Sequence, residues 1–198
     1  MIQVVDRITE IIRSESRVID LGCGDGSLLK VLKEKKQVNG LGLEINIDQI
    51  EECVKNDVPV LQMDIDKGLK IFNDKQFDVA ILHYTMQEVR NPLLIYREMM
   101  RIANSCIVVF SNFAYWKVRL NLLRHGKMPV TERLPYLWYE TPNIHLMSVE
   151  DLLSLCKNEG GQIIKTEYYG NDKIDQLLIN GGYPNLGAST ALIHMKSI

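Results

Sequence analysis

Apolar positions along the chain follow two spacings in turn, and this alternation predicts a succession of helices and strands. Residues 4–12 carry apolar side chains three and four positions apart, which predicts an opening amphipathic helix. Short apolar runs and further helical patterns then alternate. The runs predict strands at Arg17–Leu21, Gly40–Glu44, Val60–Met63, Phe77–His83, Ile107–Phe110, Ile163–Tyr168 and Ala191–Met195. We therefore expect a doubly wound α/β fold with a mostly parallel seven-stranded sheet.

Capping and turn residues place the helices between these strands. The expected helices are Ser27–Glu34, Ile47–Val54 behind an Asn46 cap, Pro92–Ile102 behind Asn91, and a helix from a Ser148–Asp151 capping box to about Asn158. The last two strands are joined by a segment rich in glycine and asparagine, in which we expect no helix. They therefore predict an antiparallel hairpin at one edge of the sheet.

One segment, residues 113–147, interrupts the alternation after the fifth predicted strand. It holds six of the fourteen aromatic residues, both tryptophans among them, and five basic residues against two glutamates. The basic residues are Lys117, Arg119, Arg124, Lys127 and Arg133. We expect a helix near residues 115–124 and a proline-bearing loop, inserted into a single domain that spans residues 1–198. Such a segment fits a protein interface, a single-stranded nucleic-acid site, or a lid packed on its own core.

Composition narrows these alternatives. A net charge of −2 and a pI near 6.1 give no general attraction to nucleic acid or to acidic membranes, which favours a protein partner. The four cysteines are scattered, with no pair or histidine at metal-ligand spacing, so we expect no metal and buried thiols in a reducing compartment. The first residues lack an uninterrupted apolar run. We therefore expect no signal peptide or membrane span, and a cytoplasmic location.

The turn after the first strand, Asp20-Leu-Gly22-Cys23-Gly24-Asp25-Gly26, carries the most specific local signal. Alternate glycines allow a tight turn and a close approach of backbone N–H groups to a ligand, although any tight turn can use glycine. A dinucleotide fits poorly, because Ser27 follows where its fingerprint needs another glycine. The acids Asp20 and Asp25 would repel a pyrophosphate and attract a cation.

Two further acids end neighbouring strands. Glu44 ends the second strand, twenty residues after Gly24, where a carboxylate can accept hydrogen bonds from a ribose diol. Asp64 ends the third strand, where it can accept a hydrogen bond from a purine amine. Either acid could instead cap the helix that follows. Because S-adenosylmethionine is cationic at its sulfonium and ammonium groups, it fits these acids better than a dinucleotide does.

These motifs resemble the class I S-adenosylmethionine-dependent methyltransferases across the whole predicted sheet. Motifs of the inserted segment are more specific, and they resemble the methionine biosynthesis protein MetW family. They are Asn112-Phe113, Trp116–Leu120, Gly126–Thr131, Leu134–Tyr136, Trp138-Tyr139 and Thr141–His145. The resemblance implies a protein that acts beside a homoserine O-acyltransferase of the α/β-hydrolase type and supports its activity. It does not imply a methyl acceptor.

The resemblance also implies where S-adenosylmethionine, or its demethylated product S-adenosylhomocysteine, would bind. The glycine loop should hold the methionine part, Glu44 the ribose and Asp64 the adenine, with Ile45 and Met63 on either side of the ring or simply in the core. The residues expected around the cofactor are Asp20, Gly22, Cys23, Gly24, Gly26, Glu44, Ile45, Met63, Asp64 and His83. In Cys23 we expect a small turn residue rather than a nucleophile.

The reacting methyl group would lie near His83-Tyr84-Thr85, where the Asn-Pro-Pro-Tyr motif of amino-group methyltransferases is absent. His83 could be a base or a structural hydrogen-bonding group, and Tyr84 could be a wall of the pocket. Candidates for a lid or partner surface in the inserted segment are Trp116, Arg119, Tyr136, Trp138, Tyr139 and His145. Two functions stay open at this point: a cofactor-binding regulator of the acyltransferase, and a methyltransferase for an unidentified small molecule.

Overall fold

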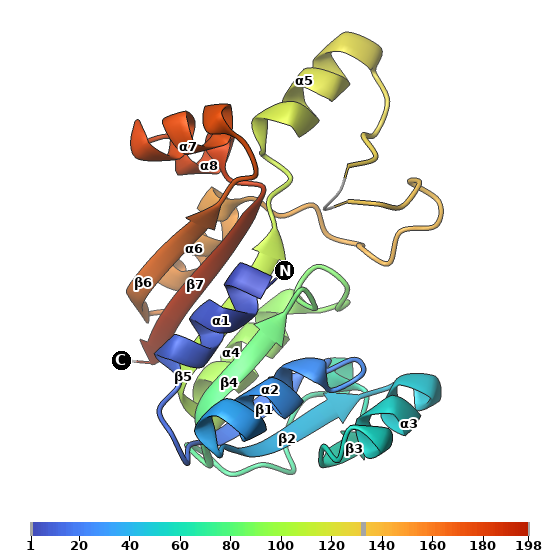
Figure 1. Ribbon diagram of the computed structural model, residues 1–198, viewed down its shortest axis with the longest axis vertical. Helices are drawn as coiled ribbons and strands as arrows, with labels where there is room; N and C mark the ends of the chain where they lie inside the picture. Colours follow the sequence, from blue (N-terminus) through green and yellow to red (C-terminus); the bar gives the residue numbers. More distant parts are fainter. Residues whose placement is uncertain (1, 132–133, 198) are drawn as a thin grey trace.

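A seven-stranded sheet organises the computed structural model, which describes residues 2–131 and 134–197 (Figure 1). The strands are β1 (Arg17–Leu21), β2 (Asn39–Glu44), β3 (Val60–Gln62), β4 (Phe77–His83), β5 (Ala103–Ser111), β6 (Gly161–Tyr169) and β7 (Thr190–Ser197). Their order across the sheet is β3-β2-β1-β4-β5-β7-β6. β7 runs antiparallel to both of its neighbours, and the other pairs are parallel. The predicted fold class is confirmed, including the antiparallel pair at the edge.

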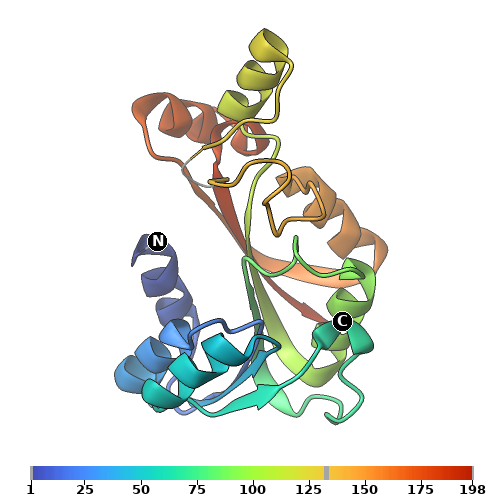
Figure 2. The ribbon, with the colours of Figure 1, turned by 90° about the vertical axis from the view of Figure 1, so that its right-hand side faces the viewer.

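Helices cover both faces of the sheet (Figures 1 and 2). They are α1 (Ile2–Ile11), α2 (Ser27–Lys36), α3 (Ile47–Lys55), α4 (Pro92–Ile102), α5 (Trp116–His125), α6 (Val149–Asn158), α7 (Lys173–Asn180) and α8 (Pro184–Gly187), with a short 3-10 helix η1 (Ile65–Lys67). One core cluster joins the sheet to α1, α2 and α3, and a second joins it to α4 and α6. Neighbours in β1 alternate between them, with Val18 in the first and Ile19 in the second.

The capping residues expected from sequence are in place. The side chain of Asn46 accepts a hydrogen bond from the Asp48 N–H at 2.8 Å and so begins α3 directly after β2. Asn91 caps α4 in the same way, and the Ser148–Asp151 capping box begins α6. These caps satisfy backbone donors that a helix start leaves open, which fixes where each crossover helix begins.

The expectation of a helix-free loop between the last two strands is wrong. The segment contains α7 and α8. Asp172 and Asp175 form a capping box at the start of α7, and Pro184 stands in the first turn of α8. Both helices are short, eight and four residues, so their apolar periodicity is brief beside the glycines and asparagines around them. Only the antiparallel pairing of β6 with β7 survives from that part of the prediction.

Residues 113–147 follow β5 and carry α5, which projects from one end of the molecule (Figures 1 and 2). The base of α5 is held by a small apolar cluster of Tyr115, Val118 and Leu134. Arg133, one of the basic residues counted above, lies outside the described residues. The described residues that follow α5 in the segment, 126–131 and 134–147, form no helix or strand, and Ile144 and His145 lie beside the loop after β4 (Figure 2).

Candidate functional site

The glycine loop after β1 uses its glycines for two different reasons. Gly22 and Gly24 both have positive φ angles, +79° and +55°, which L side chains rarely adopt. A Cβ on Gly22 would lie 2.5 Å from Thr85 Cγ2, so β1 and the end of β4 can approach only because Gly22 has no side chain. A Cβ on Gly24 would meet nothing closer than Gln49 Oε1 at 3.8 Å. Gly22 therefore serves close packing, and the backbone at Gly24 is accessible to a ligand.

Glu44, at the end of β2, is held by backbone donors. Its Oε2 accepts the Gly24 N–H at 2.9 Å, and its Oε1 accepts the N–H groups of Ile45 and Asn46 at 2.8 and 2.9 Å. A carboxylate offers about four lone-pair sites, so three are filled and Oε2 retains one. Glu44 thus both fixes the glycine loop onto β2 and keeps an acceptor for a further donor such as a ribose hydroxyl.

Asp64 follows β3 and caps η1, the alternative that the sequence left open. Its Oδ1 accepts the Asp66 N–H at 3.1 Å, and Lys67 Nζ lies 3.5 Å from its Oδ2. Its side chain nevertheless lines the same cavity as Glu44, together with Asp66. A capping role and a ligand contact are therefore compatible at Asp64.

The glycine loop and the residues that follow β2, β3 and β4 line a cavity of about 750 Å³ at the carboxyl ends of β1, β2, β3 and β4. Nine residues from the predicted site or surface line it: Gly22, Gly24, Glu44, Ile45, Met63, Asp64, His83, Tyr84 and Tyr136. Ten residues outside the predicted site and surface sets also line it: Leu43, Asn46, Gln49, Ile65, Asp66, Thr85, Glu88, Val89, Arg90 and Pro142. The volume is within the range of about 300–1,000 Å³ that is common for small-molecule sites.

Asp20 lies behind the glycine loop rather than in the cavity lining. It is 1% exposed, and its Oδ1 has no hydrogen-bond partner within the described part of the chain. Burial, helped by the negative charge of Glu44, raises the pKa of the Asp20 carboxyl to about 8. An unpaired buried carboxyl of this kind would be stabilised in its ionised form by a cation bound nearby.

Cys23 and Gly26 also lie beneath the loop. The Cys23 thiol packs against Gly42, where an added Cβ would lie 2.4 Å from the sulfur, and it is 3.8 Å from the Cys53 thiol. Burial raises the pKa of Cys23 well above its ordinary value, so the thiol stays neutral. A Cβ on Gly26 would meet the Cys53 sulfur at 3.0 Å. These positions hold the loop against α3, and a role in cofactor binding stays a prediction for both.

His83 ends β4 and Tyr84 follows it, and both residues line the cavity. Their ring centroids lie 4.7 Å apart, and burial lowers the pKa of His83 to about 4. His83 is therefore neutral at neutral pH. Tyr84 has a φ of +66°, which is strained for an aromatic residue, and its N–H donates to the Val109 carbonyl at 2.8 Å. This conformation is held by the sheet and aims the end of β4 at the cavity.

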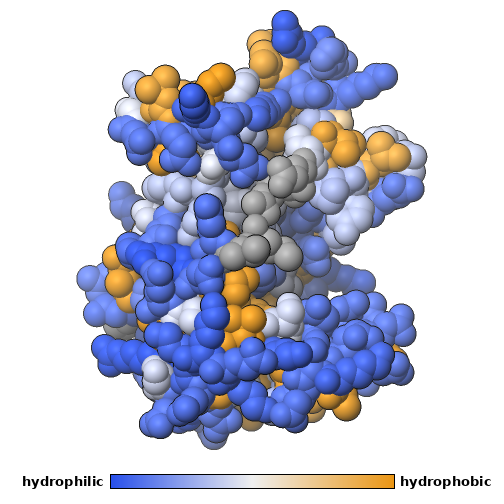
Figure 3. All heavy atoms as spheres, viewed as in Figure 1, coloured by the Kyte–Doolittle hydropathy of each residue, from blue (hydrophilic) through white to orange (hydrophobic). Residues whose placement is uncertain are grey.

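The candidate residues of the inserted segment separate into three groups. Trp116 is half-buried, and its Nε1 donates to the buried carboxylate of Asp175 at 2.7 Å. Tyr136 lines the cavity. Trp138 and Tyr139 face solvent, 74% and 64% exposed, with their rings perpendicular. Apolar side chains gather around α5 and the segment that follows it (Figure 3).

Backbone contacts attach this segment to the loop after β4. The N–H groups of Ile144 and His145 donate to the Gln87 carbonyl at 2.9 and 3.0 Å. Gln87 itself is buried, and its Oε1 accepts the Ser111 N–H at 3.1 Å. Arg119 is exposed, and its Nε donates to the Ala114 carbonyl within the segment. His145 thus takes part through its backbone in holding the segment beside the cavity.

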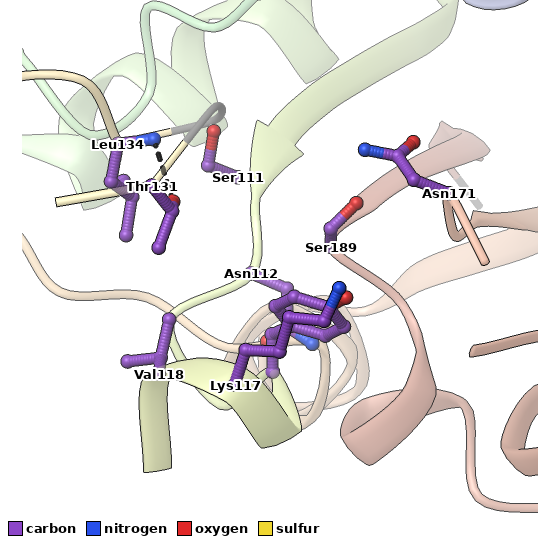
Figure 4. A pocket seen from close by; sticks show the side chains of 9 residues that line it. Ser111, Asn112, Lys117, Val118, Thr131, Leu134, Asn171 and Ser189 are labelled. Atoms are coloured by element: carbon purple, nitrogen blue, oxygen red, sulfur yellow. Dashed lines mark hydrogen bonds between the residues drawn. The ribbon is translucent and has the colours of Figure 1, made fainter. Parts of the chain in front are cut away.

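A second and smaller pocket lies between the end of β5, α5 and the segment before α7 (Figure 4). Its volume is about 100 Å³. A water molecule occupies about 30 Å³ in the liquid, so this pocket has room for a few waters and not for a nucleoside. The cavity at the glycine loop is therefore the better candidate for ligand binding.

Two residues important to this arrangement were not expected from sequence. Asp175 accepts hydrogen bonds from the hydroxyl of Tyr115, from Trp116 Nε1 and from the N–H groups of Asn171 and Asp172. The signal for it was the Asp172–Asp175 pair, which has the spacing of a capping box. No local signal pointed to Gln87, because its role depends on its backbone carbonyl, which accepts from Ile144 and His145 nearly sixty positions away.

Comparison with known proteins identifies the family. The family described as "Methionine biosynthesis protein MetW" matches residues 3–194. The chain belongs to the MetW family. A relative of the MetW-family chain is the bifunctional methionine biosynthesis protein MetXA/MetW of Rhodopirellula baltica, 31% identical over 197 residues. The match covers 95% of this chain and 32% of that protein, so the MetW-family chain spans about a third of its relative's length.

Solved structures share its fold at low sequence identity. An S-adenosylmethionine-dependent methyltransferase from Mesorhizobium loti aligns with a TM-score of 0.69 at 15% identity, over 96% of this chain and 95% of its own. A methyltransferase from Methanosarcina mazei gives 0.70 at 16%, over 97% of both chains. The [4+2]-cyclase SpnF gives 0.68 at 14%, over 98% of this chain and 80% of its own. The class I methyltransferase fold is thus shown, and the fold alone does not fix an activity.

The described residues contain neither a metal-binding cluster nor a membrane-spanning helix. Within residues 2–131 and 134–197 of the MetW-family chain, no group of three or more His, Cys, Asp or Glu side chains could hold a metal ion. Over the same residues, no helix has the length and apolar character needed to cross a membrane.

Proposed function

We propose that this MetW-family chain binds S-adenosylmethionine or S-adenosylhomocysteine in the cavity beside the glycine loop. The observation that carries the proposal is the acidic lining: Glu44 keeps a free acceptor site, and Asp64 directly follows β3, the strand that pairs with β2. Asp20, buried and without a partner for its Oδ1 among the described residues, lies behind the loop. Together these acids suit a ligand with a ribose, a purine amine and a cationic amino-acid part.

We further propose that the ligand-bound chain supports or regulates a homoserine O-acyltransferase of the α/β-hydrolase type. The name of the Rhodopirellula baltica relative joins a MetXA part and a MetW part in one protein, which supports a physical association with a second methionine biosynthesis protein. The exposed aromatic and apolar side chains of the inserted segment supply a surface for it. Regulation would then be linkage, in which ligand and partner alter each other's affinity.

Isothermal titration calorimetry and co-purification test these two parts separately. S-Adenosylhomocysteine titrated into the purified chain should bind at one site, and the acyltransferase from the same organism should co-elute with the chain in size-exclusion chromatography. Absence of any binding heat contradicts the cofactor proposal, and separate elution contradicts the partner proposal. If both bind, equal affinities for the ligand with and without the acyltransferase contradict regulation by linkage.

A methyltransferase for a small molecule is the second candidate function. Its support is the neutral ring of His83 and the strained Tyr84 in the cavity lining, beside the end of β4 where we expect an acceptor to meet the methyl group. Incubation of the chain with tritiated S-adenosylmethionine and a small-molecule extract tests it. Label in a product that requires active chain supports transfer, and no label despite calorimetric binding contradicts it.

We also propose a cytoplasmic location. Its support is the state of the four cysteines, which are free and buried, as expected of a protein from a reducing compartment. Fractionation of cells followed by immunodetection would check it.

A further inference from the structure

A short turn in the inserted segment has one side in the cavity and the other in solvent. Tyr136 and Pro142 line the cavity, although both are also exposed and Tyr136 is 50% exposed. Between them, Leu137, Trp138 and Tyr139 are 42%, 74% and 64% exposed, and none of these three lines the cavity. The distance along the chain from the ligand site to the exposed indole is therefore only two residues.

The turn is a compact structure rather than an extended strand. The N–H groups of Glu140 and Thr141 donate to the Leu137 carbonyl at 3.0 and 3.1 Å, which makes Trp138 and Tyr139 the tip of the turn. Their rings lie perpendicular with centroids 5.6 Å apart. A displacement of the inner side of such a turn carries its tip along, because the backbone hydrogen bonds hold the two together.

Both flanks of the turn are attached to the rest of the molecule. Before it, Leu134 is buried against Tyr115 and Val118, and after it the His145 N–H donates to the Gln87 carbonyl. Motion that begins at Tyr136 is therefore confined to residues between these two attachments. The exposed tip is the part that can respond.

The chemistry of the tip suits a protein partner. Glu140 is the one formally charged residue in the sequence from 134 to 144, so the turn lacks the cations that binding to nucleic acid or anionic lipid requires. Exposed Trp and Tyr side chains side by side are typical anchors of protein interfaces. An apolar pocket on a protein is the occupant that fits them.

From this geometry we propose that residues 136–142 form a protein-contact surface whose shape depends on the occupant of the cavity. The inference rests on the proposed function, since the occupant is S-adenosylmethionine or S-adenosylhomocysteine and the partner is the acyltransferase. The ligand contacts Tyr136 and Pro142 on the inner side. The turn shifts between its attachments, and Trp138 and Tyr139 change their presentation to the partner.

Fluorine NMR of the chain labelled with 5-fluorotryptophan tests the coupling in the absence of a partner. The two tryptophans give two resonances, and the exposed substitution Trp138→Phe assigns them. Saturation with S-adenosylhomocysteine should shift the Trp138 resonance and leave that of Trp116, which is hydrogen-bonded to Asp175, in place. Calorimetry on the same sample establishes that the ligand is bound. Bound ligand with an unshifted Trp138 resonance overturns the inference and leaves the proposed cofactor binding intact.

Two tyrosine variants separate coupling from simple proximity. Tyr136→Ala should abolish the Trp138 shift at ligand saturation, because the contact from the cavity is gone. Tyr139→Ala, at an exposed position outside the cavity lining, should keep it. In the wild type, ligand should change the affinity for the acyltransferase by about fivefold or more, and in Tyr136→Ala by less than about twofold. Equal ligand effects in both proteins overturn the inference, whereas failure of the wild type to bind ligand overturns the proposed function as well.

Discussion

The indole of Trp116 and the carboxylate of Asp175 are joined by a hydrogen bond of 2.7 Å, although 58 residues separate them in the sequence. Asp175 is fully buried and accepts also from the Tyr115 hydroxyl at 2.8 Å. Lys117 adds an ion pair with Asp172 at 2.6 Å beside them. The base of α5 is thus attached to the start of α7 by a buried charge whose hydrogen bonds are satisfied.

Removal of this carboxylate should destabilise the protein. In Asp175→Ala, the donors of Tyr115 and Trp116 lose a charged acceptor in a buried place, and we expect the free energy of unfolding to fall by about 3 kcal/mol. Urea denaturation followed by circular dichroism measures it. The control is Asp151→Ala, which removes an exposed capping carboxylate and should cost about 1 kcal/mol. Equal losses in the two variants would show that burial of Asp175 adds nothing.

Glu44 should be required for ligand binding. Glu44→Ala removes the proposed acceptor of the ribose and the contact that holds the Gly24 N–H, so we expect the affinity for S-adenosylhomocysteine to fall by at least about tenfold. Glu51→Ala, an exposed position on α3, should bind as the wild type does. Isothermal titration calorimetry measures the affinity of both variants for S-adenosylhomocysteine. Unchanged affinity in Glu44→Ala would show that the ribose lies elsewhere.

Local signals in the sequence were sufficient for most of the fold. The bounds of β1 and β4 match the predicted strands residue for residue, because each strand carries a run of buried apolar residues that only Asp20 and Asp78 interrupt in its interior. β5 begins at Ala103, four residues before its apolar run at Ile107, and its first residues pair with β4 although they are small or polar. Hydrogen bonding to a neighbouring strand, which no local pattern records, decided that boundary.

In the cavity too, some features could be predicted from local sequence and others depend on contacts between distant parts of the chain. Glu44 and Asp64 could be predicted to lie together because the carboxyl ends of parallel strands meet at one edge of a sheet. The half-buried position of Trp116 could not be predicted, because it depends on a carboxylate in α7, a helix that the sequence analysis missed. Tyr136 and Trp138 are both exposed aromatic residues of one short segment, and only the path of the chain beside Gln87 determines that Tyr136 lines the cavity and Trp138 does not.

The buried carboxyl of Asp20 should make stability depend on pH. Its pKa is raised from 3.8 to about 8 in the folded protein. Between these two pH values the carboxyl is ionised in the unfolded chain and still protonated in the folded one. Without ligand, the contribution of Asp20 to the free energy of unfolding should therefore fall as pH rises from about 4 to about 8 and then level off. In Asp20→Asn this part of the slope should vanish. Denaturant titrations across that range measure both proteins, and identical slopes would contradict the assignment.

Binding of a cationic ligand should reverse the preference of Asp20. An ammonium or sulfonium nearby favours the carboxylate, so S-adenosylmethionine should bind with release of a proton below about pH 8. Calorimetry in buffers of different ionisation enthalpy measures the number of protons released. Asp20→Asn should release fewer. No difference between the wild type and the variant would show that the ligand's charge lies too far from Asp20 to affect it.

The exposed face of α5 should contribute to partner binding independently of the ligand. Leu123 is 84% exposed at the projecting end of the molecule, in a stretch from 116 to 131 that contains four Lys and Arg residues and no acid. An apolar side chain among cations suits an apolar pocket with an acidic rim, so Leu123→Asp should weaken binding of the acyltransferase by about tenfold or more. Val54→Asp, at a 67% exposed position on α3, is the matched control and should bind normally. Surface plasmon resonance at two salt concentrations measures both. If the interface includes α5, its cations should make binding weaker at the higher salt concentration. Normal binding by Leu123→Asp, together with an affinity that is the same at both salt concentrations, would place the interface away from α5.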